Sequence, residues 1–300
     1  MRVLVSGGSG LIGSELVRVL GTARHEVVRL VRAEPMPGPS RIVWDPAGGW
    51  LEAPRLEGFD AVVHLAGESV AQTPWTAEKK ARIHDSRVAS TRLLAETLSR
   101  VQRKPAVFAC ASAIGYYGDR GDEELDETSP PGKGFLADVC RQWEAAAQRA
   151  ATAGIRVVRM RFGLVLSQRG GAFARTLPLF RRGLGGRLGS GRQYVSWIVL
   201  DDVVAAIQRI LSDNSLDGPI NVVGPNPVTN LELTRVTAGV LHRPAPLPVP
   251  AFLLRLKLGE MADELVLAGQ RVYPRRLQAA GHTFAYPELE PAIRRLLEAG

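Results

Sequence analysis

Short β-branched apolar runs alternate with longer amphipathic stretches through the first 224 residues of the chain. The runs predict buried strands, and the stretches, with apolar residues three or four positions apart, predict helices. The first helices are expected from Leu11 to about Leu20 and from about Thr76 to Arg100. Strands are expected at residues 3–6, 26–31, 42–45, 59–67, 106–112, 155–162 and 220–224. This alternation is typical of an α/β fold with a Rossmann-type, doubly wound parallel sheet.

The pattern changes beyond Pro225, where helical segments are expected to start near Asn230, Phe252, Pro274 and Glu288. The proline-rich residues 244–250 form a stiff connection between them. The sequence therefore predicts a small, mostly helical C-terminal domain that covers the carboxyl edge of the sheet. We expect a Rossmann domain of residues 1–165 and 195–224, and a substrate or cap domain of residues 166–194 and 225–300.

Three glycines, Gly7, Gly10 and Gly13, lie between the first predicted strand and the first predicted helix. One permits a tight turn, one permits close approach of the backbone to a pyrophosphate, and Gly13 permits packing of the helix on the sheet. The N–H groups and dipole of the helix start favour phosphate. The stretch predicts a dinucleotide site, although a tight turn without ligand is the alternative. The other expected contacts here are Ser9, Leu11 and Ile12.

The residue that follows the second predicted strand indicates which dinucleotide binds. NAD sites place Asp or Glu there to bind the ribose 2′-hydroxyl, whereas this chain has Arg32. A guanidinium suits a 2′-phosphate, so the sequence favours NADP(H), as NADPH, over NAD. Glu34 keeps NAD open, and a solvated arginine is the alternative role for Arg32. Ser6 and Arg29 are weaker candidates.

Composition narrows the remaining choices. With 45% apolar residues and no apolar run near about 20 residues, we expect no membrane span, no signal peptide and a cytoplasmic location. Cys110 and Cys140 are too few for a disulfide framework. No metal site is expected, because the histidines are scattered and lack ligand spacing: His25, His64, His84, His242 and His282.

The chain carries a net charge of +8. Its 33 arginines are spread along the sequence rather than gathered in a basic tail, and an acidic stretch occupies residues 119–127. No nucleic-acid docking motif accompanies the charge, so we expect no nucleic-acid partner. An amphipathic membrane-binding helix is also not expected, because no segment pairs an apolar face with a lysine-rich one.

The strand expected at residues 106–112 leads into Ser112, Tyr116, Tyr117 and Gly118. With the glycine-rich start and a strand ending in Leu-Ala-Gly, this resembles an extended short-chain dehydrogenase/reductase of the sugar-nucleotide epimerase type. More narrowly, the chain resembles an "epimerase family" branch with a C-terminal domain of unknown function. That likeness rests on residues 67–70, 75–76, 86–88, 135–137, 143–144, 183–186, 189–191 and 196–198.

The resemblance also exposes a departure. Catalytic members of the superfamily carry a Tyr-x-x-x-Lys pair, in which lysine lowers the tyrosine pKa for proton transfer. Phe135 and Val139 stand at the expected positions here, and neither can exchange a proton. We predict Ser112 and Tyr116 as the catalytic residues. Packing is the alternative role for the tyrosines, and further candidates are Tyr117 and Asp138.

Further cofactor contacts follow from sheet geometry and from the resemblance. Ligands of doubly wound sheets lie across the carboxyl ends of the strands, which places Leu65, Ala66 and Gly67 beside the cofactor. His64, inside the same strand, is expected to be a packed core residue. The resemblance implies that Arg87 and Val165 also contact the cofactor. The glycine-rich basic residues 181–192 suit a diphosphate or carboxylate, or form a flexible loop.

Two functions remain open on this evidence. The first is an NADP(H)-binding oxidoreductase or epimerase-like enzyme, acting on a small polar substrate that is nucleotide-linked or otherwise anionic. The second is a non-catalytic NADP(H)-binding redox sensor, which the absent tyrosine–lysine pair favours. A monomer and a homodimer are both compatible with the sequence.

Overall fold

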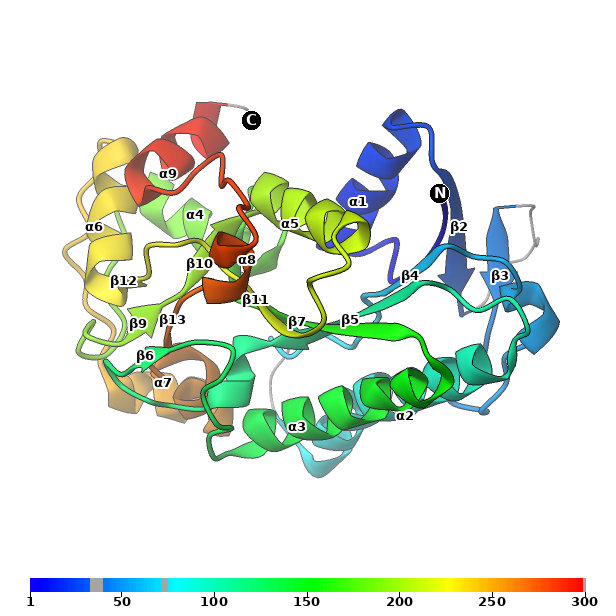
Figure 1. The fold of residues 1–300 in the computed structure, drawn as a ribbon. Helices are drawn as coiled ribbons and strands as arrows, with labels where there is room; N and C mark the ends of the chain where they lie inside the picture. The colour runs from blue at the N-terminus through cyan, green and yellow to red at the C-terminus, as the bar shows by residue number, and fades with distance from the viewer. Residues whose placement is uncertain (33–39, 72–74, 299–300) are drawn as a thin grey trace.

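The computed structural model describes residues 1–32, 40–71 and 75–298, and a seven-stranded parallel sheet forms its centre (Figure 1). The strand order, β11-β7-β5-β4-β1-β2-β3, reverses direction at β1, as in a doubly wound sheet. The strands are β1 (Arg2–Ser6), β2 (Glu26–Val31), β3 (Arg41–Val43), β4 (Ala61–His64), β5 (Val107–Ala113), β7 (Arg156–Phe162) and β11 (Gly218–Val222). The predicted Rossmann-type fold is confirmed.

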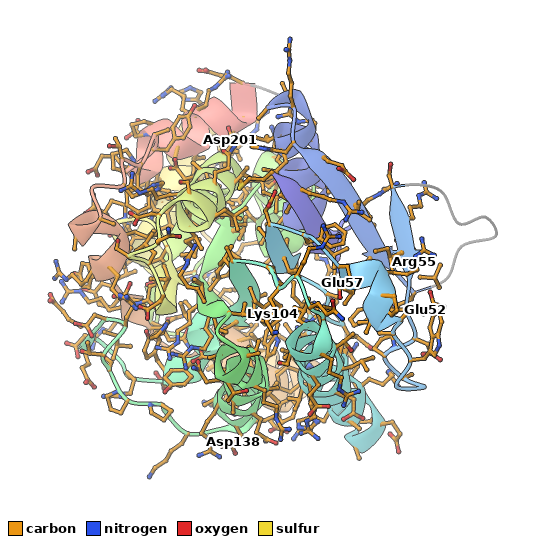
Figure 2. All side chains as sticks on the ribbon, turned by 45° about the vertical axis from the view of Figure 1, so that its right-hand side comes forward. Glu52, Arg55, Glu57, Lys104, Asp138 and Asp201 are labelled. Carbon is orange, nitrogen blue, oxygen red and sulfur yellow. The ribbon has the colours of Figure 1, made fainter. Side chains whose placement is uncertain are left out.

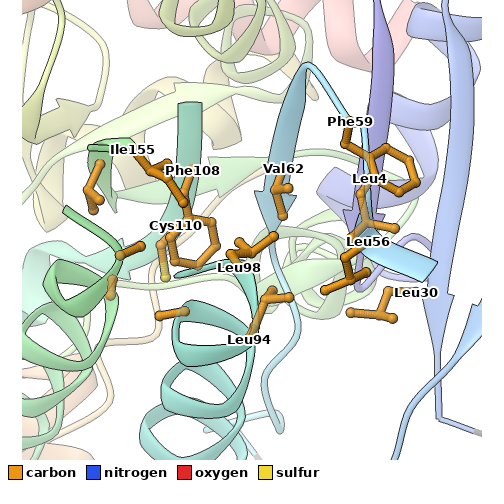
Figure 3. Close-up of a cluster of buried hydrophobic side chains, with 14 of the residues drawn as sticks. Leu4, Leu30, Leu56, Phe59, Val62, Leu94, Leu98, Phe108, Cys110 and Ile155 are labelled. Atoms are coloured by element: carbon orange, nitrogen blue, oxygen red, sulfur yellow. The ribbon is translucent and has the colours of Figure 1, made fainter. Parts of the chain in front are cut away.

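Helices cover both faces of this sheet. Helices α1 (Leu11–Thr22) and α5 (Leu200–Ser212) cover one face, and α2 (Ala77–Arg100) and α3 (Phe135–Gln148) cover the other (Figure 1). Successive strand residues point to opposite faces of the sheet. Val3 and Val5 therefore lie in a first apolar core, against α1 and α5, whereas Leu4 lies in a second core, against α2 and α3. Figure 3 shows Leu94 and Leu98 of α2 beneath the strands in this second core.

Two strand ends differ from the sequence-based expectation. Strand β3 ends at Val43, because Asp45 turns away to form a bridge with Trp50. Strand β4 ends at His64, so residues 65–67 continue beyond the sheet as a loop at its carboxyl edge. Glu34, which keeps NAD open, lies outside the described residues.

The C-terminal part assembles against one end of the sheet. Around a third apolar core lie β8 (Leu164–Leu166), α4 (Gly171–Arg181), β10 (Trp197–Val199), β12 (Val228–Thr229), α6 (Asn230–Val240) and α9 (Leu289–Glu298). Four helices were expected in this part, and each starts within one residue of its expected position. They are α6, α7 (Ala251–Leu258), α8 (Arg275–Ala279) and α9. Short strand pairs join β12 to β9 (Tyr194–Val195) and β13 (Arg271–Val272) to β6 (Glu124–Leu125).

Helix α5 begins at Leu200, because β10 leads directly into it, and Asp201 and Asp202 lie in its first turn. Asp201 is exposed (Figure 2), while the buried Asp202 carboxylate accepts hydrogen bonds from the backbone N–H groups of residues 285 and 286.

Among the described helices, none combines the length and apolar character that crossing a membrane requires.

Candidate functional site

The glycine turn between β1 and α1 is packed against the loop that follows β4. Gly7 has a φ of +69°, and a Cβ atom placed on it would lie 2.7 Å from the Leu65 carbonyl carbon. A Cβ atom on Gly13 would lie 2.2 Å from the Gly7 carbonyl oxygen. Gly13 thus permits α1 to approach the turn itself, rather than the sheet as the sequence suggested. Glycine is required at both positions by the protein's own packing.

Gly10 differs from these two glycines. Its φ is −75°, and the nearest atom to an added Cβ is the Gly7 oxygen at 3.3 Å. Helix α1 has no side-chain cap and no acidic residue in its first turn among the described residues. Its N–H donors therefore face an exposed turn at Ser9 and Gly10, beside the partly buried Leu11 and Ile12. This arrangement can bind an anion.

The loop after β4 is held by a buried polar pair. Ser6 Oγ lies 2.5 Å from His64 Nδ1 and accepts hydrogen bonds from the N–H groups of Leu65 and Ala66. His64 is fully buried, and this burial lowers its pKa to about 3, so the ring is neutral at pH 7. The prediction that His64 is a core residue is confirmed. Ser6 positions residues 65–66, which the sequence could not show.

Arg87 approaches this loop from helix α2. Its Cζ atom would lie 3.3 Å from a Cβ atom on Gly67, and it stands 5.2 Å from the Trp143 ring centroid. One nitrogen donates to the Ile83 carbonyl at 3.1 Å. Burial lowers the pKa of Arg87. No ion pair involves Arg87 within the described ranges, so its charge is available to an anionic ligand beside Gly67.

The structure brings Val165 to the start of α1. Cβ atoms placed on Gly170 and Gly171, which follow β8, would lie 3.6 and 3.5 Å from the Leu11 side chain. The Cβ on Gly171 would also lie 3.7 Å from the Val165 carbonyl oxygen. Two stretches that sequence analysis treated separately are therefore neighbours.

The other side of the glycine turn faces strand β2. The Arg29 side chain packs on the turn, with its Cδ atom 3.2 Å from a Cβ placed on Gly8. Arg32, directly after β2, is exposed. The structure thus leaves Arg32 open to solvent, where a phosphate could reach it.

The candidate catalytic Ser112 belongs to a buried charged network. Its Oγ donates to Glu144 Oε1 over 2.8 Å, and Arg161 donates to both oxygens of the same carboxylate, over 2.7 and 2.8 Å. All three residues are at most 4% exposed. The hydroxyl hydrogen of Ser112 is donated to Glu144, so only the lone pairs of the Ser112 oxygen remain for another partner. Ser112 is set to accept a hydrogen bond.

The two tyrosines differ in their surroundings. Tyr116 is partly exposed, and its ring centroid lies 3.5 Å from the Arg161 guanidinium carbon. Tyr117 is fully buried, with its hydroxyl 2.7 Å from Asn221 Oδ1 and 2.9 Å from Arg161 Nη1. Burial raises the pKa of Tyr117 to about 12, which disfavours proton transfer near pH 7. The packing alternative therefore describes Tyr117.

Glu144 and Arg161 were missed as site residues by sequence reasoning. Glu144 lay within a noted family stretch, and a charged residue inside a predicted buried strand was the available signal for Arg161. Asp138, in contrast, does not join Ser112. It lies on the outer side of α3 (Figure 2) and pairs with Arg141 over 2.8 Å.

Phe135 begins helix α3, where its ring contacts Trp75 and its N–H donates to Glu264 Oε1 over 3.0 Å. The Leu136 N–H donates to Glu264 Oε2 at the same distance, so a C-terminal carboxylate caps this helix. Val139 is 2% exposed. Neither position where the superfamily has its tyrosine–lysine pair carries a group that can exchange a proton.

The glycine-rich residues 181–192 pack against the proline-rich segment instead of forming a free loop. A Cβ atom on Gly186 would overlap the Leu247 carbonyl, and Leu188 forms a bridge with Val249. A cavity of about 290 Å³ opens beside them, lined by residues that include Arg187 and Arg235. Both the anion-binding role and the flexible-loop alternative stay predictions.

Comparisons with known proteins agree with this architecture. The NAD dependent epimerase/dehydratase family matches residues 3–224, and the domain of unknown function DUF1731 matches residues 249–296. Epimerase family protein Mb2239 of Mycobacterium bovis is 43% identical, over 97% of this chain and 96% of its own. This similarity covers both the residues matched by the epimerase family and those matched by DUF1731.

Two solved structures are also similar. The crystal structure of human epimerase family protein SDR39U1 with NADPH is 35% identical, with a TM-score of 0.90 over 99% of both chains. A nucleoside-diphosphate sugar epimerase from Corynebacterium glutamicum is 38% identical, with a TM-score of 0.82 over 99% of this chain and 58% of that one. The chain therefore belongs to the NAD-dependent epimerase/dehydratase family and carries the DUF1731 domain near its C-terminus.

Proposed function

We propose that this protein binds NADPH across the glycine turn and uses it as an oxidoreductase or epimerase-like enzyme on a small polar substrate. The observation that carries the proposal is the exposed start of α1, whose N–H donors have no side-chain cap or first-turn carboxylate among the described residues. The similarity to human SDR39U1, crystallised with NADPH, supports this choice of cofactor.

The proposed cofactor site has three parts. The glycine turn holds the diphosphate, Arg32 binds the 2′-phosphate, and Arg87 offers its charge near residues 65–67. The remaining proposed contact is Val165. Its carbonyl lies near Gly171, which in turn lies against the Leu11 side chain. The proposed residues of the turn and loop are Gly7, Ser9, Gly10, Leu11, Ile12, Gly13, Leu65, Ala66 and Gly67.

Ser112 and Tyr116 are the proposed catalytic residues. Ser112 would accept a hydrogen bond from a substrate hydroxyl, because its own hydrogen is held by Glu144. The nucleotide-linked substrate class is supported by the similarity to the Corynebacterium sugar epimerase. The proposal includes the two-domain division given above, a cytoplasmic location, and a monomer or homodimer that binds no nucleic acid and no membrane.

A non-catalytic redox-sensing protein is the second candidate. It is favoured by Phe135 and Val139, because no titratable side chain replaces the usual tyrosine–lysine pair at those positions. The two candidates share the cofactor site and differ in turnover.

Thermal unfolding with NADPH, with NADH and without ligand tests the cofactor. The stabilisation grows with the ratio of ligand concentration to Kd, so measurements at equal concentrations rank the affinities of the two cofactors. The Arg32→Ala variant should lose the preference for NADPH, whereas an unchanged preference would refute the phosphate contact. Absence of stabilisation by either cofactor would refute the proposed function.

Turnover distinguishes the enzyme from the sensor. NADPH fluorescence is followed after adding a panel of carbonyl compounds that also carry a hydroxyl group, including 4-keto nucleotide sugars. Decay that disappears in Ser112→Ala and Tyr116→Phe would support the enzyme and exclude the sensor. Tight NADPH binding without decay across the whole panel would favour the sensor.

A further inference from the structure

Glu15 is a buried carboxylate in the second turn of α1, directly after the glycine turn. It is 4% exposed and binds two arginines through different oxygens. Arg18, on the same helix, donates from Nε to Oε1 over 3.0 Å. Arg169, which follows β8, forms an ion pair with Oε2. One carboxylate therefore joins α1 to a segment 154 positions away.

Arg169 belongs to a short segment that lies over the start of α1. Its N–H donates to the buried Ser167 Oγ over 3.1 Å. The next two residues, Gly170 and Gly171, are those whose added Cβ atoms would lie 3.5–3.6 Å from Leu11. Residues 167–171 thus reach the same first turn of α1 where the diphosphate is proposed to bind.

We infer that Arg169 is a positioning residue for dinucleotide binding. By pairing with Glu15 it holds residues 167–171 against α1 before the cofactor arrives, so that this segment forms a second wall of the site. A segment that is already ordered loses less conformational entropy when ligand binds. This inference rests on the proposed function, because it assigns a role in binding NADPH.

The structure supplies a matched control. Arg18 and Arg169 have similarly exposed side chains, 64% and 59%, and each pairs with Glu15. Only Arg169 links the carboxylate to another segment. Removing either arginine leaves Glu15 with one cationic partner, so both variants should unfold at similar temperatures without ligand. Only the loss of Arg169 should release residues 167–171.

The test measures the Kd for NADPH by fluorescence titration and the unfolding temperature without ligand. We expect Arg169→Ala to raise Kd about twofold to fivefold, the range for a partly exposed ion pair that supports binding. Arg18→Ala should change Kd less than about twofold, and Arg169→Lys should restore part of the affinity because its ammonium can still pair with Glu15.

Glu15→Gln separates positioning from direct contact with the cofactor. If Arg169 acts through Glu15, this variant weakens NADPH binding about as much as Arg169→Ala. The variant that combines Glu15→Gln with Arg169→Ala then binds NADPH as well as either single variant. An unchanged or tighter Kd in Glu15→Gln would overturn the positioning role. Equal losses in Arg18→Ala and Arg169→Ala would also overturn it. If the unmodified protein does not bind NADPH, the proposed function itself fails.

Discussion

The buried pair of Glu144 and Arg161 permits a quantitative test of the site. Replacing Glu144 by Gln preserves side-chain volume but removes the negative charge that faces a guanidinium only 2% exposed. The amide nitrogen of glutamine would place N–H donors against the donors of Arg161. One carboxylate oxygen now accepts from both Ser112 and Arg161, and a glutamine cannot reproduce all three hydrogen bonds.

The expected loss follows from the charge left behind. Removing one partner of a buried ion pair costs about 3–5 kcal/mol, because the other charge remains desolvated without compensation. A domain of this kind has a total free energy of unfolding of about 5–15 kcal/mol. Glu144→Gln should therefore remove a large fraction of the stability. The Tyr116 ring should also lose its fixed position, since it stacks on Arg161.

Urea unfolding followed by circular dichroism measures this loss as a change in the free energy of unfolding. The double variant Glu144→Leu with Arg161→Met is the control, because it removes both charges and should recover much of the stability. A loss below about 1 kcal/mol in Glu144→Gln would refute the buried network, since exposed pairs contribute no more than that.

The remaining predictions concern packing, a helix cap and a buried histidine. Gly13→Ala should destabilise the protein by about 1–3 kcal/mol in urea unfolding, because its Cβ overlaps the turn. Gly10→Ala should cost less than about 1 kcal/mol, because its Cβ only touches the Gly7 oxygen, and should weaken NADPH binding. Equal destabilisation by the two variants would contradict this distinction. Glu264→Ala should cost about 1 kcal/mol as a lost cap of α3, whereas no change would show that water replaces the carboxylate. His64 is neutral when folded, with a pKa of about 3, so its contribution is complete above pH 6.5 and falls as the pH drops toward 3. Between pH 7 and 5 the protein should lose about 2 kcal/mol that a His64→Phe variant does not lose.

Local sequence determined the frame of this protein. Apolar runs and helical periodicity placed the strands and helices, because backbone hydrogen bonding and burial of one face depend on neighbours only a few residues apart. The glycine turn was also readable, since a positive φ at Gly7 favours glycine whatever surrounds it. The family resemblance rested on such stretches along the full chain and was confirmed.

Tertiary structure alone decided how the site residues are used. Ser112 meets Glu144 across 32 positions, and Glu15 meets Arg169 across 154. Sequence spacing carries no information about such contacts, because they arise where separate elements converge at one edge of the sheet. The same reason explains Ser6, whose hydroxyl accepts a hydrogen bond from the loop after β4. Which side chain holds a charge, a proton or a loop depends on partners that only the folded chain brings within hydrogen-bond distance.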